Sequence, residues 1–312
     1  MTEAAPLFDD LADAPPGGRA VWLHPADGPR IRAAIWGAHA AKGTVFLFPG
    51  RTEYIEKYGR AAGDFAARGY ATLVVDWRGQ GLADRAFADR LIGHIGDFDE
   101  YQRDVDALIA LATAEGLPRP YHLMCHSMGG CIGLRSLMRG LPFASAVFSA
   151  PMWGISMAAW SRPVAHVLGR LAPIFGQGHR YAPGTGGQTY VLAAPFQDNV
   201  LTTDPEMWEY MRRQVAAHPD LALGGPSLGW LGAALRECGM LATMPAPTTP
   251  AVTALGTAEK VVDVAPIHLR MAGWRTGRLD LYQGAEHEVP METPAHRSRF
   301  FDSAATLFSA HS

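Results

Sequence analysis

The sequence predicts an α/β fold in which helices cover a mostly parallel sheet of eight strands. Short runs rich in β-branched and aromatic residues alternate with longer segments of helical period, which is typical of such a sheet. The composition agrees, because 48% of the 312 residues are hydrophobic and 18% are charged, enough for a large core. The expected strands are residues 20–24, 31–36, 44–48, 71–75, 121–125, 146–149, 251–255 and 278–282.

The first two strands are expected to pair antiparallel, ahead of the parallel strands. Turn residues Asp27, Gly28 and Pro29 separate them. The clearest helix covers residues 97–115, where apolar side chains recur on one face. A last helix, about 295–309, is expected to dock across the edge of the sheet.

Strand patterns disappear between residues 151 and 244. Trp, Met, Pro and Gly dominate this block, which lies between two predicted strands. We therefore predict a core built from residues 1–150 and 245–312, with residues 151–244 as an inserted helical cap. Because apolar clefts under caps are the usual ligand pockets, part of the cap is expected to face an active site.

Charge and cysteine usage indicate the compartment and exclude some partners. The net charge is −3 and no run of Lys or Arg occurs, so nucleic acid is not expected as a partner. The odd number of cysteines, Cys125, Cys131 and Cys238, contains no C-x-x-C pair, which favours a reducing compartment. No signal peptide or membrane-spanning stretch is recognised, so a cytoplasmic location is expected.

The most informative stretch surrounds Ser127. An apolar strand, a sharp turn and a helix follow one another, with the serine at the turn. Small residues are needed two positions to either side of such a serine, because strand and helix come into close contact there. Cys125 and Gly129 occupy these positions. We interpret Ser127 as a nucleophile, although serines in such patterns are more often helix N-caps.

A nucleophilic serine needs a base, and His287 has the best position for it. It lies in the loop after the last predicted strand, where the sites of open α/β sheets gather. His126 is the neighbour of Ser127 and is expected to be a wall or packing residue. The other histidines are interpreted as structural, as in His94 and His122, or lie elsewhere, as do His179, His218 and His268.

Two carboxylates follow the preceding strand and qualify to orient this histidine. Glu259 lies within the loop and is favoured. Asp263 marks the expected start of the next helix, where an acidic residue caps backbone amides without any catalytic role, and it remains the alternative. Either choice gives the chain order serine, acid, histidine.

An oxyanion would need two backbone donors. One is the amide of Met128, at the start of the helix after Ser127. The second is the amide of Arg51, in the loop after strand 44–48, where Gly50 lets the backbone pass close to a substrate. This loop is also an ordinary turn from strand to helix.

Together these segments resemble α/β-hydrolases of the monoacylglycerol lipase and bacterial lysophospholipase group. The resemblance rests on His126-Ser127-Met128-Gly129-Gly130, residues 76–81, the Pro49-Gly50 loop and Gly284-Ala285-Glu286-His287. It implies the α/β-hydrolase fold, a triad of Ser127, Glu259 and His287, and a structural role for residues 76–81. Two departures stand out: Cys125 replaces the usual glycine, and Glu259 replaces the usual aspartate.

The predicted activity is hydrolysis of lipid-like carboxylic esters through an acyl-serine intermediate. Alternatives are a small-ester carboxylesterase, a cofactor-free peroxidase or C–C hydrolase on the same fold, or a binding protein that has lost catalysis. Neither a cofactor nor a metal is expected, since the glycine-rich residues 184–187 follow no strand and no metal-ligand spacing occurs. A small-molecule ester or lipid is the expected partner, with transient contact of the apolar cap with a membrane surface.

Overall fold

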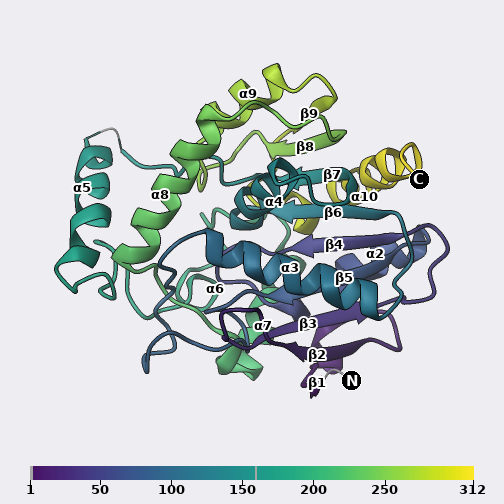
Figure 1. Ribbon diagram of the computed structural model, residues 1–312, viewed down its shortest axis with the longest axis horizontal. Helices are drawn as coiled ribbons and strands as arrows, with labels where there is room; N and C mark the ends of the chain where they lie inside the picture. Colours follow the sequence, from purple (N-terminus) through teal and green to yellow (C-terminus); the bar gives the residue numbers. More distant parts are fainter. Residues whose placement is uncertain (1–2, 159) are drawn as a thin grey trace.

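The computed structural model describes residues 3–158 and 160–312. They form a nine-stranded sheet with helices on both faces (Figure 1). The strands are β1 (Glu3–Ala5), β2 (Arg19–Leu23), β3 (Ile31–Trp36), β4 (Thr44–Phe48), β5 (Ala71–Asp76), β6 (Tyr121–His126), β7 (Phe143–Ser149), β8 (Ala251–Gly256) and β9 (Gly277–Tyr282). The α-helices are α1 (Asp9–Ala12), α2 (Gly59–Ala67), α3 (Asp99–Ala114), α4 (Met128–Met138), α5 (Ser161–Ile174), α6 (Tyr190–Ala193), α7 (Pro205–Ala217), α8 (Leu228–Thr243), α9 (Val264–Gly273) and α10 (Pro294–Ser309), and short 3₁₀ turns cover Ile55–Tyr58, Pro219–Leu221 and Val289–Met291.

The sheet has the order β1-β2-β3-β5-β4-β6-β7-β8-β9. From β5 to β9 all neighbouring strands are parallel, whereas β1, β2, β3 and β5 pair antiparallel, as expected for the first strands. Every residue of β4 and β6 is buried, so these strands are almost continuous apolar runs. The chain reverses its direction of winding around β4, and in open α/β sheets such a point carries the ligand site.

The sheet has nine strands, which corrects the predicted eight. The additional strand, β1, has three residues and pairs antiparallel with β2 at the edge. It contains only a glutamate and two alanines, so no alternation or β-branched run marks it in the sequence.

The last helix lies on a face of the sheet, and the prediction that it docks across the edge was wrong. On α10, Phe300, Phe301 and Phe308 are buried in one cluster with Leu47 of β4 and Met124 of β6. The spacing of these phenylalanines points them to one side of the helix, so α10 covers central strands together with α2.

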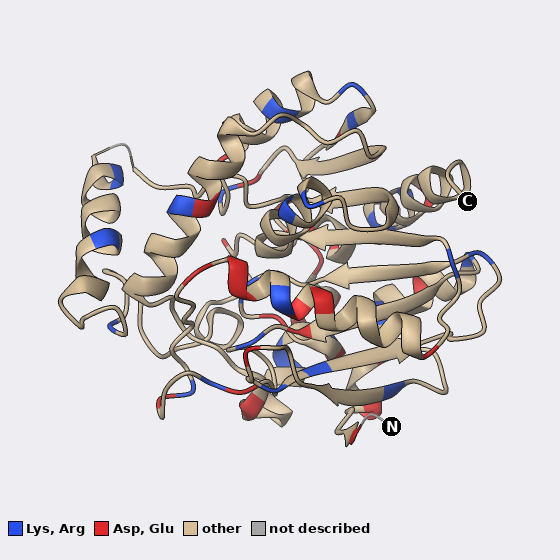
Figure 2. Ribbon diagram, viewed as in Figure 1, with Lys and Arg blue, Asp and Glu red and all other residues tan. Residues whose placement is uncertain are grey.

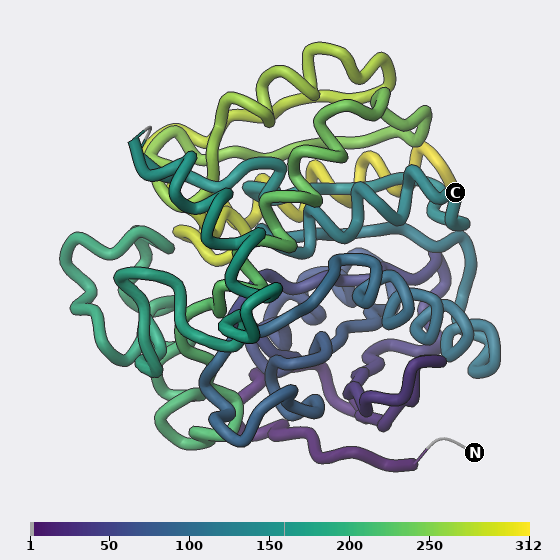
Figure 3. The backbone as a smooth tube through the Cα atoms, turned by 60° about the vertical axis from the view of Figure 1, so that its left-hand side comes forward, coloured from purple at the N-terminus to yellow at the C-terminus, as the bar shows by residue number. Residues whose placement is uncertain are grey.

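The stretch between β7 and β8 contains α5 to α8 and, among its described residues, no strand. In Figure 1, α5 lies at one end of the molecule, beyond the carboxyl ends of the parallel strands, and the turned view of Figure 3 brings this end of the chain forward. Helix α8 is different, because Trp230, Ala234 and Cys238 are buried in the same cluster as the core helices. Among the described residues, no helix is long and apolar enough to cross a bilayer.

Helix α5 packs on α8 through two glycines. A Cβ atom at Gly232 would overlap the backbone of Gly169, and one at Gly169 would overlap Gly232. The two helix backbones therefore approach more closely than residues with side chains would allow.

Candidate active site

Ser127 occupies the turn between β6 and α4 and has an unusual backbone. Its φ is +50° and its ψ −117°, a conformation that non-glycine residues rarely adopt. The turn is fixed by a hydrogen bond from the Ser127 amide to the Ser149 carbonyl, 3.1 Å long, and by one from the Gly130 amide to the Ser127 carbonyl, 2.8 Å long. A Cβ at Gly129 would overlap the Phe48 carbonyl, so the helix lies directly against β4.

The cysteine at position 125 is accommodated by a glycine on the facing helix. A Cβ at Gly133 of α4 would overlap the Sγ atom of Cys125. Both residues are fully buried or nearly so. A glycine at position 125 would leave space between β6 and α4. Here Gly133, one turn along the helix from Gly129, provides that space instead.

His287 and Glu259 form a buried pair. The Nδ1 atom of His287 lies 2.7 Å from Oε2 of Glu259, and the histidine and glutamate side chains are only 4% and 1% exposed. The other oxygen, Oε1, accepts hydrogen bonds from the amides of Val261 and Val262, at 2.6 and 3.0 Å. Burial alone would raise the pKa of Glu259, but the hydrogen bonds from His287 and the two amides lower it below the ordinary value.

Asp263 lies at the N-terminus of α9, away from His287's ring nitrogens. Its Oδ1 atom accepts a hydrogen bond from the amide of Ala265, 3.2 Å long, and its Oδ2 atom pairs with Arg162 at 3.1 Å. This is the arrangement of a helix cap. The structure thus places Glu259, and not Asp263, in hydrogen-bond contact with the imidazole of His287.

The loop after β4 is held by the segment that follows β5. The indole of Trp77 donates to the Pro49 carbonyl at 3.0 Å, and the amide of Gln80 donates to the Gly50 carbonyl at 3.0 Å. The backbone amide of Thr52 donates to Gln80 at 3.2 Å. Residues 76–81 therefore position the Pro49-Gly50 loop and do not face the cavity.

The side chain of Arg51 turns away from the loop. One guanidinium nitrogen donates to the Gly224 carbonyl at 2.9 Å, and the group lies 5.5 Å from the ring centre of Trp230. Burial lowers the pKa of Arg51 to about 10, which leaves it charged at neutral pH. The guanidinium is therefore engaged by Gly224 and Trp230, and only the backbone amide of Arg51 remains a candidate oxyanion donor.

A buried ionic cluster, which the sequence did not reveal, supports the site from below. The ammonium of Lys57 lies 2.7 Å from Glu53 and 2.6 Å from Glu288. Glu53 also accepts hydrogen bonds from the hydroxyl of Tyr58, 2.5 Å long, and from the amide of Gly50. The cluster thus ties the loop after β4 to the residue next to His287.

The charges of this cluster are set by burial and pairing. Burial alone would raise the pKa of Glu53, but Lys57 and His126 lower it to about 2. Burial would lower the pKa of Lys57, yet Glu288 and Glu53 raise it above the ordinary value. Glu288 has a raised pKa because of burial. At neutral pH Lys57 is therefore a fixed cation and Glu53 a fixed anion.

Glu53, His126 and Glu288 have ligand atoms close enough together to hold a metal ion. The ammonium of Lys57 contacts both carboxylates of this trio, so it already supplies the positive charge that a cation would bring. The chain itself therefore supplies a cation that pairs with both carboxylates of this donor set.

Three other histidines, His126, His94 and His122, have the packed or hydrogen-bonded environments expected of structural residues. His126 lines the cavity beside His287, with 4.7 Å between ring centres, and burial lowers its pKa to about 3. Nδ1 of His94 lies 2.7 Å from the hydroxyl of Ser227, and Nδ1 of His122 lies 2.9 Å from that of Ser145.

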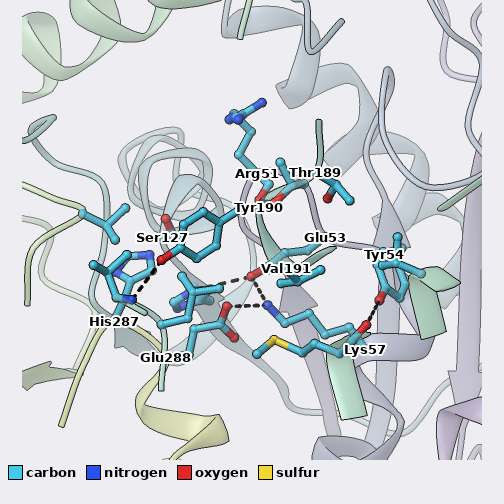
Figure 4. A pocket seen from close by; sticks show the side chains of 17 residues that line it. Arg51, Glu53, Tyr54, Lys57, Ser127, Thr189, Tyr190, Val191, His287 and Glu288 are labelled. Carbon is cyan, nitrogen blue, oxygen red and sulfur yellow. Dashed lines mark hydrogen bonds and ion pairs between the residues drawn. The ribbon is translucent and has the colours of Figure 1, made fainter. Parts of the chain in front are cut away.

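A cavity of about 250 Å³ unites these groups (Figure 4). Ser127 and His287 lie on one side of it, and Lys57 lies between Glu53 and Glu288 below. Most of the apolar wall comes from the stretch between β7 and β8. These wall residues are Tyr190, Val191, Val200, Leu201, Met211 and Val215.

Comparison with known proteins gives a consistent result. A family described as serine aminopeptidase, S33, matches residues 39–294. Lysophospholipase L2 of Escherichia coli K12 is 32% identical over 279 residues, which is 86% of this chain and 80% of that protein. A probable lysophospholipase L2 of Haemophilus influenzae is 30% identical over 256 residues, covering 81% and 79%.

A monoglyceride lipase of Saccharomyces cerevisiae, solved with a substrate analogue, has a similar fold. The TM-score is 0.72, with 18% identity, and the match covers 93% of this chain and 94% of that one. At this identity the similarity concerns the fold.

Proposed function

The chain belongs to the serine aminopeptidase S33 family of α/β-hydrolases, and on this premise we propose that it cleaves the ester bond of single-chain lipids, lysophospholipids or monoacylglycerols. It is a carboxylic ester hydrolase, like the lysophospholipases with which it shares about a third of its residues. The observation that carries the proposal is the cavity in which Ser127 and His287 meet an apolar wall.

The proposed reaction follows from the placement of each group. Ser127 attacks the ester carbonyl while His287 accepts its proton, and Glu259 keeps the imidazole in the tautomer that accepts at Nε2. The amides of Arg51 and Met128 hold the oxyanion of the tetrahedral intermediate. His287 then protonates the leaving alcohol, and a water molecule, activated by the same histidine, releases the fatty acid and restores Ser127.

The cavity supports an acyl chain as the part of the substrate that is recognised. Its wall residues are apolar, whereas its charged groups Lys57, Glu53 and Glu288 are paired with one another. A volume of about 250 Å³ is below the roughly 300–1,000 Å³ of drug-sized pockets. One acyl chain fits such a space better than the two of a phospholipid, and the part of residues 151–244 that precedes α8 acts as the cap that encloses it.

Labelling with a fluorophosphonate probe tests the nucleophile. We expect the wild-type protein to be labelled at one serine, and the Ser127→Ala and His287→Ala variants to lose labelling and at least about 10³-fold in activity. Ser161→Ala and His166→Ala, on the exposed helix α5, are the matched controls and should be labelled as the wild type is. A folded wild-type protein that is not labelled would contradict the proposal and favour a binding protein.

The dependence of the rate on acyl-chain length tests the substrate class. With lysophosphatidylethanolamines and monoacylglycerols of increasing length, kcat/KM should rise with each methylene until the apolar wall is filled. A rate that is highest for acetate esters would instead indicate a small-ester carboxylesterase.

A further inference from the structure

Helix α5 carries a row of large apolar side chains that face solvent. Among the described residues, six of the eleven exposed large apolar side chains lie between positions 160 and 175. They are Trp160, Val164, Val167, Leu171, Ile174 and Phe175, with exposed fractions from 43% to 81%. Such a concentration is unusual for a surface that meets only water.

The spacing of these residues makes them a single stripe. Positions 160, 164, 167, 171 and 174 alternate steps of four and three, which on a helix of 3.6 residues per turn fall within an arc of about 80°. Gly169, the residue through which α5 packs on α8, lies on the opposite side of the helix. The stripe is therefore not used for packing within the chain, and we name these residues, with Phe175, the α5 stripe.

The charges around the stripe are of one sign. Residues 151–197 contain no Asp or Glu, although the whole chain has a net charge of −3. The arginines in this range are Arg162, Arg170 and Arg180, and Figure 2 shows α5 with blue and no red segments. Arg162 is paired with Asp263, whereas Arg170 and Arg180 are exposed and have no ion pair among the described residues, and Arg170 is next to the stripe.

We propose that the α5 stripe docks the protein on the surface of an anionic lipid bilayer. An exposed apolar face flanked by arginines inserts into the headgroup region, while the cations attract anionic lipids. The stripe lies at the end of the molecule beyond the carboxyl ends of the parallel strands, where Ser127 and His287 also lie. This contact would keep the cavity near the membrane that supplies single-chain lipids, and in this respect it rests on the proposed function.

Vesicle sedimentation tests the proposal, with all variants made in the Ser127→Ala background so that no lipid is hydrolysed. Vesicles of phosphatidylcholine alone are compared with vesicles of equal parts phosphatidylcholine and phosphatidylglycerol. We expect binding to the anionic vesicles, weakened by salt, and at least about tenfold weaker binding after Val167→Glu. Arg170→Gln should weaken binding to the anionic vesicles about fivefold.

The matched control is Leu269→Glu, which makes a comparable change on the exposed leucine of α9, 78% exposed. It should bind as the parent does. Binding by Val167→Glu equal to the parent, or no binding to either vesicle, would overturn the proposal. A doubling of mass in light scattering, abolished by Val167→Glu, would overturn it in favour of self-association through the stripe.

A second readout separates this proposal from the proposed function. With Ser127 intact, Val167→Glu should hydrolyse a soluble short-chain ester at the wild-type rate but lose activity on vesicle-bound lipid. Binding without any ester hydrolysis would leave the docking surface in place and remove the assigned activity.

Discussion

Glu259 uses both carboxylate oxygens, one on His287 and the other on two backbone amides. The side chain is longer than the aspartate usual in related proteins, but its carboxylate is still held in a fixed orientation. The loop amides orient it, so a glutamate at this position can hold the imidazole as an aspartate would.

Replacing each of the two candidate acids separately will show which one serves the histidine. Glu259→Gln should lower kcat about 10³-fold, because glutamine cannot stabilise the imidazolium that forms during the reaction. Asp263→Asn should keep activity within about twofold and change the unfolding free energy by less than about 1 kcal/mol, because asparagine caps helices as well as aspartate does. The reverse pattern of kcat values would identify Asp263 as the acid.

The pH dependence of stability will report on Glu53. Its pKa, about 2 in the fold, is lower than the ordinary 4.5, so its ionised form stabilises the protein fully above about pH 4.5 and this contribution is lost as the pH falls toward 2. Glu53→Gln should reduce the unfolding free energy by about 3 kcal/mol at pH 7, and by progressively less below about pH 5.

Urea unfolding at a series of pH values measures this difference. The control Glu209→Gln removes a carboxylate from an exposed pair with Arg212 and should change stability by less than about 0.5 kcal/mol throughout. A Glu53→Gln difference that stays constant down to about pH 3.5 would show that the cluster does not depend on this charge.

At the scale of elements, the sequence predicted the central strands well. The bounds of β3 and β4 agree at both ends, because turn-forming or charged residues border these buried strands: Arg30 and Gly37 border β3, and Gly43 and Pro49 border β4. Ser127, Glu259 and His287 could be chosen as site residues because position in the topology restricts them, and the structure brings Glu259 onto His287 and places Ser127 and His287 at one cavity. Lys57 was missed because its partner Glu288 is 231 positions away, and sequence alone does not show such a contact.

The contact between β6 and α4 depends on a complementary pair of residues. Gly133→Ala should lower the unfolding free energy by about 2 kcal/mol despite the better helix propensity of alanine, because the new methyl group would overlap Sγ of Cys125. In the Cys125→Ala background, the same change should be nearly neutral.

A double-mutant cycle from urea unfolding measures this coupling. Gly239→Ala is the control, since nothing lies within 4 Å of a Cβ at that position of α8. It should stabilise the protein slightly or leave it unchanged. Equal costs of Gly133→Ala with and without the sulfur atom would show that the helix moves aside freely.

Across the whole molecule, the two faces of the sheet and the carboxyl ends of its strands have different roles. The buried clusters on both faces hold the strands, while the loops at the carboxyl ends provide Ser127, Glu259 and His287. The ionic cluster of Lys57 connects the loop after β4 with the loop after β9, on the two sides of the cavity. The stretch between β7 and β8 then adds the apolar wall and the α5 stripe at the same end.

The neighbouring positions of β7 and β8 have a consequence for how such proteins diversify. The chain leaves the sheet after Ser149, the last residue of β7, and returns at Ala251, the first residue of β8, which pairs with Ala146, so the long excursion begins and ends at adjacent strands. The two attachment points are therefore fixed whatever lies between them. Because α8 belongs to the core, the stretch from α5 to α7 is the portion that recombination or protein engineering can exchange, which would change the wall of the cavity and leave the turn that carries Ser127 unchanged.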